Sequence, residues 1–329
     1  MKKLVGLICY CALFTVGCTK SSIDETTDVT NGLAANEAPI TARHCASQDV
    51  LEAQLKADPT LASRMQAIEE ASLRFQQNPE QFRLLANGII EIPVVVNVLY
   101  RTAAENISLA QIQSQIDVLN ADYSGTNPDA ANVPTIFQGV KAGDVGIRFV
   151  LDQVIRKATN KTSWTTNDAM KKTSGGGLNP TSPTTKLNMW CCNLSGGILG
   201  YAQFPGGSSA TDGVVMDNNA FGVTTTGAPY NKGRTATHEV GHWLNLRHIW
   251  GDAQCGNDLV SDTPLHTGAN YGCPAAGVRS TCSGTPVMMT MNYMDYTDDL
   301  CMYMFSAGQK ARMKATFATG GGRTGFAQP

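Results

Sequence analysis

The sequence has no excess of charge of either sign and no long apolar run. Its 329 residues include 25 Lys and Arg against 27 Asp and Glu, a formal net charge of −2. The basic residues form no field that would attract a polyanion, so nucleic-acid binding is not expected. The apolar stretch Leu4–Val16 is shorter than the roughly 20 residues that cross a bilayer as a helix. No internal repeat is visible.

Histidine is scarce, and its placement is the most informative feature of the chain. Three of the five histidines fall within HEVGHWLNLRH, from His238 to His248. Residues four apart lie on one face of a helix, so His238 and His242 can bind the same tetrahedral Zn²⁺. His248 comes six residues after His242 and would project away from the metal on a continuing helix. We therefore expect the helix to end near Asn245.

Glu239 lies beside the expected metal. Zinc lowers the pKa of a water that it binds from about 15.7 to roughly 7, and Glu239 could take that proton and pass it to the leaving amine. Structural zinc sites are closed by four protein ligands, often cysteines, and no cysteine lies in this stretch. The pattern therefore predicts an open catalytic site for peptide hydrolysis. Two unconnected histidines on an exposed helical face are the alternative.

The motif resembles the metzincin signature H-E-x-x-H-x-x-G-x-x-H, with Asn245 in place of the glycine that turns the chain. Asparagine also enters the left-handed region, so the turn remains feasible. Within the metzincins, HEVGHWLNLRHIWGD and the segment NYMDYTDDLCMYMF, Asn292–Phe305, resemble the pappalysin family. The resemblance implies that Met294 forms an apolar floor under the imidazoles and that Tyr296 hydrogen-bonds the developing oxyanion. A Met-rich patch of ordinary core is the alternative.

The resemblance also implies where substrate binds. In metzincins an edge strand above the cleft pairs with extended substrate, and the stretch LNMWCCNLSGGILGYAQFP is typical of two strands, the second beginning near Ile198. The chain just past the Met-turn lines the S1′ pocket, so Asp298 or Asp299 could favour Lys or Arg directly after the cut. The alternatives are an ordinary edge strand and a solvated acidic turn. The residues expected to contact the substrate main chain are Gly197, Ile198, Leu199, Gly200, Tyr201 and Ala202.

The segment Gly251–Pro264 is dense in Asp and Asn. Ca²⁺ takes six to eight oxygen ligands, and Asp258, Asp262 and Thr263 could supply some of them. The resemblance implies calcium near this position, although such loops are commonly only turns. The expected cofactors are Zn²⁺ and, as an open alternative, Ca²⁺.

The N-terminus predicts export. Residues 1–18 contain Lys2 and Lys3, then an apolar stretch and Cys18, the layout of a bacterial signal peptide. Thr15–Cys18 resembles a lipobox, in which Cys18 would be lipidated and anchor the protein at the outer surface or in the periplasm. Simple cleavage followed by secretion is the alternative. Residues 19–40 are polar and indicate a flexible tether.

An oxidising compartment favours disulfides among the late cysteines. Four such cysteines allow three connectivities, and the pappalysin pattern implies the pairs Cys255–Cys282 and Cys273–Cys301. The neighbours Cys191 and Cys192 would point to opposite faces of a strand, so we do not expect them to bond to each other.

Cys45 lies in segment 41–85, which we interpret as a pro-segment. Pappalysins are made as zymogens, and Arg43, His44 and Cys45 stand where a cysteine switch would place a thiolate on the zinc. A free cysteine in an exported domain is the alternative. From Asp49 to Phe75 the pattern is helical and amphipathic, which suits a segment that covers a cleft.

Residues 86–329 are expected to form one catalytic domain. The run Ile89–Tyr100 predicts a buried strand, the apolar spacing after it a helix with Ser108 as N-cap, and Val145–Val154 a further strand. The chain after Asn245 is expected to be mostly irregular up to a helix at Ala307–Phe317. Together these elements predict an α+β metzincin fold with a mixed twisted sheet.

We therefore expect a monomeric zinc endopeptidase that cleaves peptides or proteins and is made as a latent zymogen. Its only contact with a membrane would be the lipid anchor. One rival is a catalytically silent, calcium-stabilised surface binding module, which the intact motif residues argue against. Another is a zinc exopeptidase or other zinc hydrolase, which would need a closed cleft end or a charged anchor for a chain terminus.

Overall fold

The structure is a computed structural model that describes residues 42–78 and 88–326. All of these residues belong to one compact unit. In this part of the chain, no helix has both the length and the apolar character needed to cross a membrane. The expected signal peptide, the tether, Cys18 and the last residues of the expected pro-segment lie outside the described residues.

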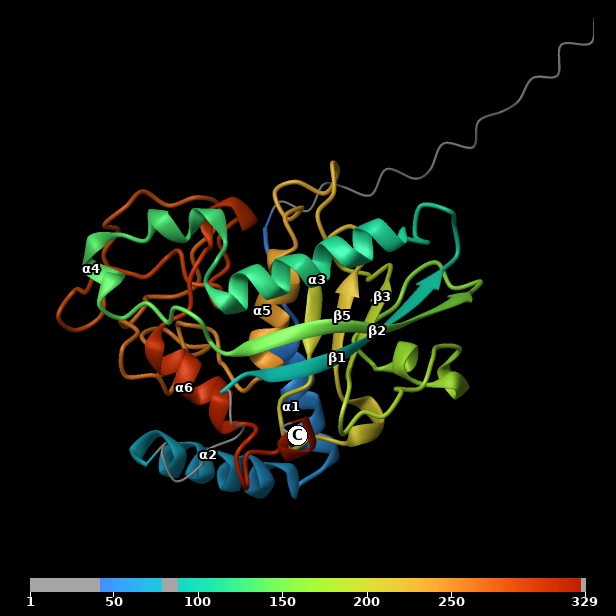
Figure 1. Ribbon diagram of the computed structural model, residues 1–329, viewed down its shortest axis with the longest axis horizontal. Helices are drawn as coiled ribbons and strands as arrows, with labels where there is room; N and C mark the ends of the chain where they lie inside the picture. The colour runs from blue at the N-terminus through green and yellow to red at the C-terminus, as the bar shows by residue number, and fades with distance from the viewer. Residues whose placement is uncertain (1–41, 79–87, 327–329) are drawn as a thin grey trace, which may run out of the picture. The chain divides into compact units, whose positions relative to one another are not determined.

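A five-stranded sheet lies at the centre of the fold of residues 88–326 (Figure 1). β4 runs antiparallel to β5 at one edge and the other pairings are parallel, which confirms the mixed sheet of an α+β fold. The central strand β3 is buried along its whole length, as expected for a strand covered on both faces. The strands, in the spatial order β2-β1-β3-β5-β4, are β1 Ile90–Tyr100, β2 Ile147–Ala158, β3 Leu187–Cys192, β4 Gly200–Ala202 and β5 Val214–Asp217.

Two helices, α3 (Leu109–Ser124) and α5 (Arg234–Trp243), pack on one face of the sheet. Figure 1 shows α3 lying along the sheet with α5 behind it. Ser108 caps α3 by accepting a hydrogen bond from the Gln111 amide at 3.1 Å, which confirms the predicted N-cap. α5 is buried over its full length. The short elements are α4 Thr135–Gln138 and the 3₁₀ helices Pro128–Asn132, Ala169–Lys171, Thr173–Gly175, Ser209–Thr211, Asp299–Cys301 and Thr324–Phe326.

Alternation along β3 separates the two neighbouring cysteines. Cys191 joins the apolar cluster beneath α3 and α5, whereas Cys192 joins a second cluster on the other face, with Trp164 and Trp190. Successive side chains of a strand point to opposite faces, so the two thiols diverge. Both are free and buried, and they are not bonded to each other, as expected.

The described part of the expected pro-segment forms two helices, α1 (Ser47–Ala57) and α2 (Leu61–Gln77). The expected helical stretch from Asp49 to Phe75 is interrupted at Pro59, which cannot continue a helix. α1 contacts β4 and α2 contacts α6. Figure 1 shows α2 beside α6 at the lower side of the domain.

The chain after α5 is largely irregular, as predicted, until α6 (Ala307–Ala315). A capping box between Ser306 and Gln309 begins α6. Two disulfides hold the irregular region, and their pairing confirms what the family resemblance implies: Cys255–Cys282 and Cys273–Cys301.

Candidate active site

The zinc-type motif begins on α5 and leaves it through a tight turn. α5 ends at Trp243, and Asn245 has φ of 71°, in the left-handed region. The Leu246 amide then bonds back to Gly241 O at 2.9 Å. The helix therefore ends where the sequence predicts, and the turn brings His248 back toward the helix.

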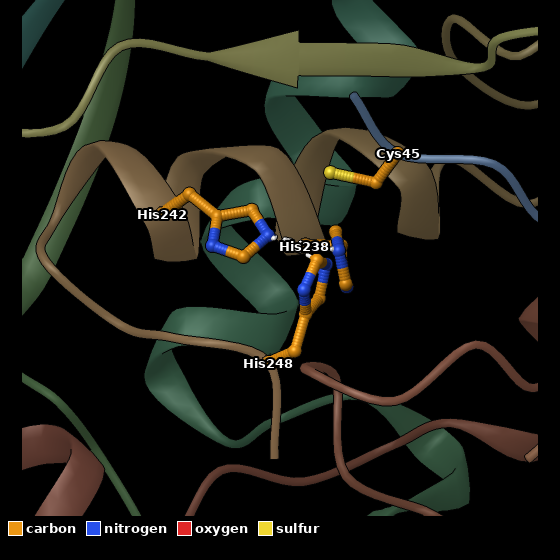
Figure 2. Close-up of side chains that lie close together, drawn as sticks. All are labelled: Cys45, His238, His242 and His248. Atoms are coloured by element: carbon orange, nitrogen blue, oxygen red, sulfur yellow. Dashed lines mark hydrogen bonds between the residues drawn. The ribbon is translucent and has the colours of Figure 1, made fainter. Parts of the chain in front are cut away.

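Three imidazoles converge at this turn (Figure 2). His242 Nε2 lies 3.1 Å from His238 Nε2 and 3.2 Å from His248 Nε2. All three residues are at most 2% exposed. Burial, followed by the neighbouring imidazoles, lowers the pKa of His238 and of His242 well below the usual value, so both rings are neutral, as metal ligands must be.

Each imidazole is oriented through its other nitrogen. Nδ1 of His238 lies 2.7 Å from Tyr293 O, and Nδ1 of His242 lies 2.8 Å from Leu246 O. Nδ1 of His248 bonds the carboxylate of Asp252. With the protons on Nδ1, three Nε2 lone pairs face one another, an arrangement that a cation between them would stabilise. This donor set fits Zn²⁺.

Cys45 completes the group. Its sulfur and the three imidazoles supply four ligand atoms that all lie within 4.8 Å of one another. Figure 2 shows the thiol turned toward the histidines from the pro-segment. Burial and the nearby Glu239 raise the pKa of the Cys45 thiol above its ordinary value in this arrangement. A bound cation acts in the opposite direction, because thiolate is the form that binds metal.

Glu239 faces the same space and is in contact with the pro-segment. Its Oε2 accepts hydrogen bonds from Ser47 Oγ at 2.9 Å and from Cys45 Sγ at 3.2 Å. Burial raises the pKa of Glu239 to about 7, and both hydrogen bonds oppose that rise. A carboxyl with a pKa near neutrality can both accept and return a proton.

Tyr296 and Met294 lie on the C-terminal side of the site. The Tyr296 hydroxyl donates to Cys45 O at 3.1 Å, and its ring packs edge-on against His248 with ring centroids 4.9 Å apart. Met294 is fully buried, and a Cβ placed on Gly241 of α5 would come within 2.5 Å of its sulfur. Met294 is therefore packed directly against α5, the helix that carries His238 and His242.

The edge strand of the sheet is paired with the pro-segment. The Leu199 amide donates to His44 O at 2.9 Å, and the Ala46 amide donates to Gly200 O at 3.1 Å. Gly200–Ala202 forms β4, whereas Gly197 and Ile198 precede the strand. The strand thus begins at Gly200 rather than near Ile198, because Gly196 and Gly197 both have positive φ and prolong the turn.

The Arg43 side chain is buried among residues of α5 and of the C-terminal region. Its Nη2 lies 2.6 Å from Asp299 Oδ1, and both side chains are at most 1% exposed. Nη1 donates to Thr235 Oγ1 at 3.0 Å, and the guanidinium lies over the Tyr230 ring. Of the two aspartates predicted for a specificity pocket, Asp299 contacts the arginine.

The residues considered for calcium have protein partners. Asp258 accepts hydrogen bonds from the Thr263 hydroxyl, and burial raises the pKa of Asp258 to about 6. Asp262 accepts from Ser306 Oγ at 2.6 Å and from the Gly308 amide at 2.8 Å, so it helps to begin α6. Asp258 and Asp262 therefore fix the loop to itself and to α6.

Sequence reasoning missed several residues of the site. Asp252 has a detectable signal, since it is a carboxylate four residues after His248 and metal-bound histidines commonly bond one. Ser47, Thr235 and Tyr230 carry no such signal, because only the tertiary fold brings them to Glu239 or Arg43.

Comparison with known proteins places this geometry in a family. The peptidase M43 family, described as pregnancy-associated plasma protein-A, matches residues 184–318. The extracellular metalloprotease of Colletotrichum graminicola is 35% identical over 269 residues, which cover 74% of this chain and 84% of the relative. The chain belongs to the pappalysin family. The extracellular metalloprotease of Pyricularia oryzae is another relative, 36% identical over 66% of this chain and 70% of its own length.

Solved pappalysin structures share the fold. A promirolysin mutant from Tannerella forsythia is 39% identical, with a TM-score of 0.75 over 87% of this chain and 97% of its own. Mature mirolysin in complex with a cleaved peptide is 43% identical, with a TM-score of 0.69 over 73% of this chain and 96% of its own. The protein is accordingly a metzincin-type zinc metallopeptidase with a pro-form, and its substrates are peptides or proteins.

Proposed function

We propose that the protein is an exported zinc endopeptidase, held latent by its pro-segment, with His238, His242 and His248 as zinc ligands. The observation that carries the endopeptidase assignment is the path of the chain through the site. Residues 42–46 pass the histidines without a chain end and continue into α1. A cleft that admits a continuous chain suits internal cleavage, whereas an exopeptidase would need a wall or a charged anchor for a terminus.

Glu239 is proposed as the general base and then the general acid. When bound, zinc would polarise the scissile carbonyl and make water acidic enough to be deprotonated near neutral pH. Glu239 takes that proton and delivers it to the leaving amine. Its burial and its position beside the histidine cluster support the role. Tyr296 would hydrogen-bond the oxyanion, since its hydroxyl already donates to a carbonyl at this point. Met294 would support the imidazoles from the apolar side.

Substrate is proposed to bind along the Leu199–Ala202 edge by strand addition. The pairing of His44 and Ala46 with this edge supports its use by an extended chain. The Arg43–Asp299 pair supports a preference for Lys or Arg at P1′, because a guanidinium already pairs there with a buried carboxylate. Asp298 is half-buried and would contribute only to the charge of the rim.

Cys45 is proposed to close the open metal position in the latent form. The meeting of its sulfur with the three imidazoles supports this role. Ser47 would assist by occupying Glu239 and the Ala202 amide, both of which its hydroxyl contacts. Release of the pro-segment would free the metal, Glu239 and the edge strand together.

Calcium near Asp258, Asp262 and Thr263 remains a proposal. A buried carboxylate with a raised pKa, as in Asp258, would be stabilised by a cation. Its test is a rise in melting temperature with Ca²⁺ over Mg²⁺ in zinc-loaded protein, which the Asp258→Asn variant should lack. An equal response to both ions in both proteins would count against the site.

The name of the relatives, extracellular metalloprotease, supports export. Lipidation at Cys18 is proposed from the lipobox resemblance, and its test is incorporation of labelled fatty acid by the natural chain but not by Cys18→Ala. We also propose that the active protein is a monomer.

The decisive experiment compares the protein freed of its pro-segment with the same form carrying Glu239→Ala. Both are incubated with an unfolded protein mixture, and new N-termini are read by mass spectrometry. We expect internal cuts that disappear in the variant and on zinc chelation. Release of single terminal residues would favour an exopeptidase. No cleavage by a zinc-loaded, folded protein would favour the silent binding module.

A further inference from the structure

The segment Trp243–Arg247 connects the second histidine of the motif to the third. Helix ends leave carbonyls without intrahelical partners, and here the chain is buried, so those carbonyls need other donors. The Asn245 amide satisfies His242 O at 2.9 Å, and Nδ1 of His242 faces Leu246 O. The carbonyls of Trp243 and Asn245 instead face two arginines from the C-terminal part of the chain.

Arg323 binds the end of α5. Its Nε donates to Trp243 O at 2.6 Å, and its guanidinium lies 3.8 Å from the centroid of the Trp243 ring. The same side chain forms a two-point pair with Asp212, at 2.6 and 3.0 Å, and donates to Gln203 O at 3.2 Å. Arg323 therefore connects the end of α5 to the chain that follows the edge strand β4.

Arg312 binds the turn itself. Its Nε donates to Asn245 O at 2.7 Å, and its Nη2 pairs with Glu69 of the pro-segment helix α2. Asn245 Nδ2 also lies 3.3 Å from Glu69 Oε1. The left-handed residue of the motif is thus held through both its carbonyl and its side chain.

The contacts of Arg312 and Arg323 favour a role in positioning the turn over a role in filling the core. The two arginine side chains are 2% and 3% exposed. A cation at the C-terminal end of a helix complements its dipole, and loss of either donor would leave a buried carbonyl unpaired. The left-handed residue of the turn is Asn245 rather than glycine. The geometry of the turn therefore depends on the hydrogen bonds that the two arginines donate to it.

We propose that Arg312 and Arg323 are positioning residues of the metal centre. By fixing the carbonyls of Asn245 and Trp243, they set where His248 stands relative to His238 and His242. The proposal rests on the proposed function in one respect, that these three histidines bind zinc. Neither arginine touches the metal or the substrate in this scheme.

The test measures zinc affinity in the full chain, not activity. All proteins carry Cys45→Ala, so that the thiol does not mask changes in the histidine set. Arg312→Met and Arg323→Met are compared with Arg312→Lys and Arg323→Lys, which keep a cationic donor. Arg148→Met is the matched control, because Arg148 pairs with Asp144 at the protein surface. Zinc affinity is measured against a chromophoric chelator, and melting temperature is measured with zinc and after its removal.

We expect each methionine variant to lose about 10- to 100-fold in zinc affinity, as supporting groups of metal ligands do. The lysine variants should recover part of the loss, and Arg148→Met should match the parent. The gap in melting temperature between zinc-loaded and stripped protein should narrow in the methionine variants.

A merely structural role predicts another result: both melting temperatures fall together and zinc affinity stays unchanged. That result would overturn the proposal. If a methionine variant does not fold, the corresponding lysine variant decides, since lysine cannot reproduce the guanidinium geometry. The proposal would be overturned if that lysine variant kept the zinc affinity of the parent and the same difference in melting temperature between zinc-loaded and stripped protein. If the parent itself binds no zinc, the proposed function fails, and the proposal about the arginines, which rests on it, fails with it.

Discussion

Asn245 occupies the position where the metzincin signature has glycine, with φ of 71°. A left-handed conformation costs an ordinary L-residue about 1–2 kcal/mol, whereas asparagine tolerates it and glycine adopts it freely. We predict that Asn245→Ala lowers the free energy of unfolding by about 1–2 kcal/mol. Asn245→Gly should remain within a few tenths of the natural protein. Urea unfolding of the full chain checks both variants. Equal losses in the two would mean that the side chain, not the backbone conformation, is what matters.

Asp299 supplies the negative charge that pairs with Arg43. We predict that Asp299→Asn in the active form reduces kcat/KM for a peptide with Arg at P1′ by about 10- to 100-fold, the loss expected for a charged hydrogen bond of about 1.5–3 kcal/mol. A peptide with Leu at P1′ should change much less. Asp298→Asn is the matched control, since Asp298 is half-buried and Arg43 pairs with its neighbour. Equal losses for both peptides would contradict the assignment.

The histidines, Glu239 and Asn245 could be predicted from the sequence because they lie in one short segment whose spacing follows from helix geometry. Asp299 could be narrowed to one of two neighbours only through family resemblance. The partnership of Arg43 with Asp299, and of Ser47 with Glu239, joins residues about 200 positions or more apart, as the sequence separations of 256 and 192 show. No periodic pattern encodes such contacts.

At the scale of elements, α5 offers a test in which two effects have opposite signs. Gly241 lies inside this helix, where Gly→Ala ordinarily stabilises by roughly 0.5–1 kcal/mol. A Cβ here would lie 2.5 Å from Met294 Sδ, closer than real contacts allow. We predict that Gly241→Ala lowers the melting temperature and weakens zinc binding, because Met294 is enclosed and α5 must shift.

The control for Gly241→Ala is Gly268→Ala, since a Cβ on Gly268 meets no atom within 4 Å. Calorimetry and a zinc titration on both variants give the answer. A second variant pairs Gly241→Ala with Met294→Ala, and the smaller side chain should recover part of the loss. If Gly241→Ala were more stable than the natural protein, the Met294 side chain could move aside without cost.

Elements with strong local patterns were predictable, and those defined by their neighbours were not. The β-branched run at Ile90–Tyr100 and the Ser108 cap specify β1 and α3 locally. β4 has only three residues, and its extent depends on pairing with β5. The amphipathic pattern of the pro-segment continues through Pro59, but the helix is interrupted there. Periodicity alone does not reveal such an interruption when the apolar pattern resumes after it.

For the whole molecule, the organisation into pro-segment and catalytic domain follows from motif order, but the way the two parts join does not. The pro-segment is attached at separate places: Arg43 pairs with Asp299, and Cys45 and Ser47 contact Glu239. Apolar residues of its two helices, including Leu51, Leu61 and Met65, pack against Phe204. Each buried aliphatic or methionine side chain contributes up to about 1.5–3 kcal/mol. Cys45, the proposed metal ligand, is therefore one of several contacts that hold the segment.

We therefore expect the full chain to remain largely latent when Cys45 is replaced. We predict that the full chain with Cys45→Ala is more active than the natural full chain but has less than about a tenth of the activity of the protein freed of its pro-segment, because the tethered segment still lies across the cleft at high effective concentration. Adding Ser47→Ala should raise activity further by freeing Glu239 and the Ala202 amide. Initial rates, measured before any self-cleavage and normalised to zinc content, decide the matter. If Cys45→Ala alone had the activity of the protein freed of its pro-segment, the thiol alone would maintain latency. The remaining contacts would then serve only to position the thiol.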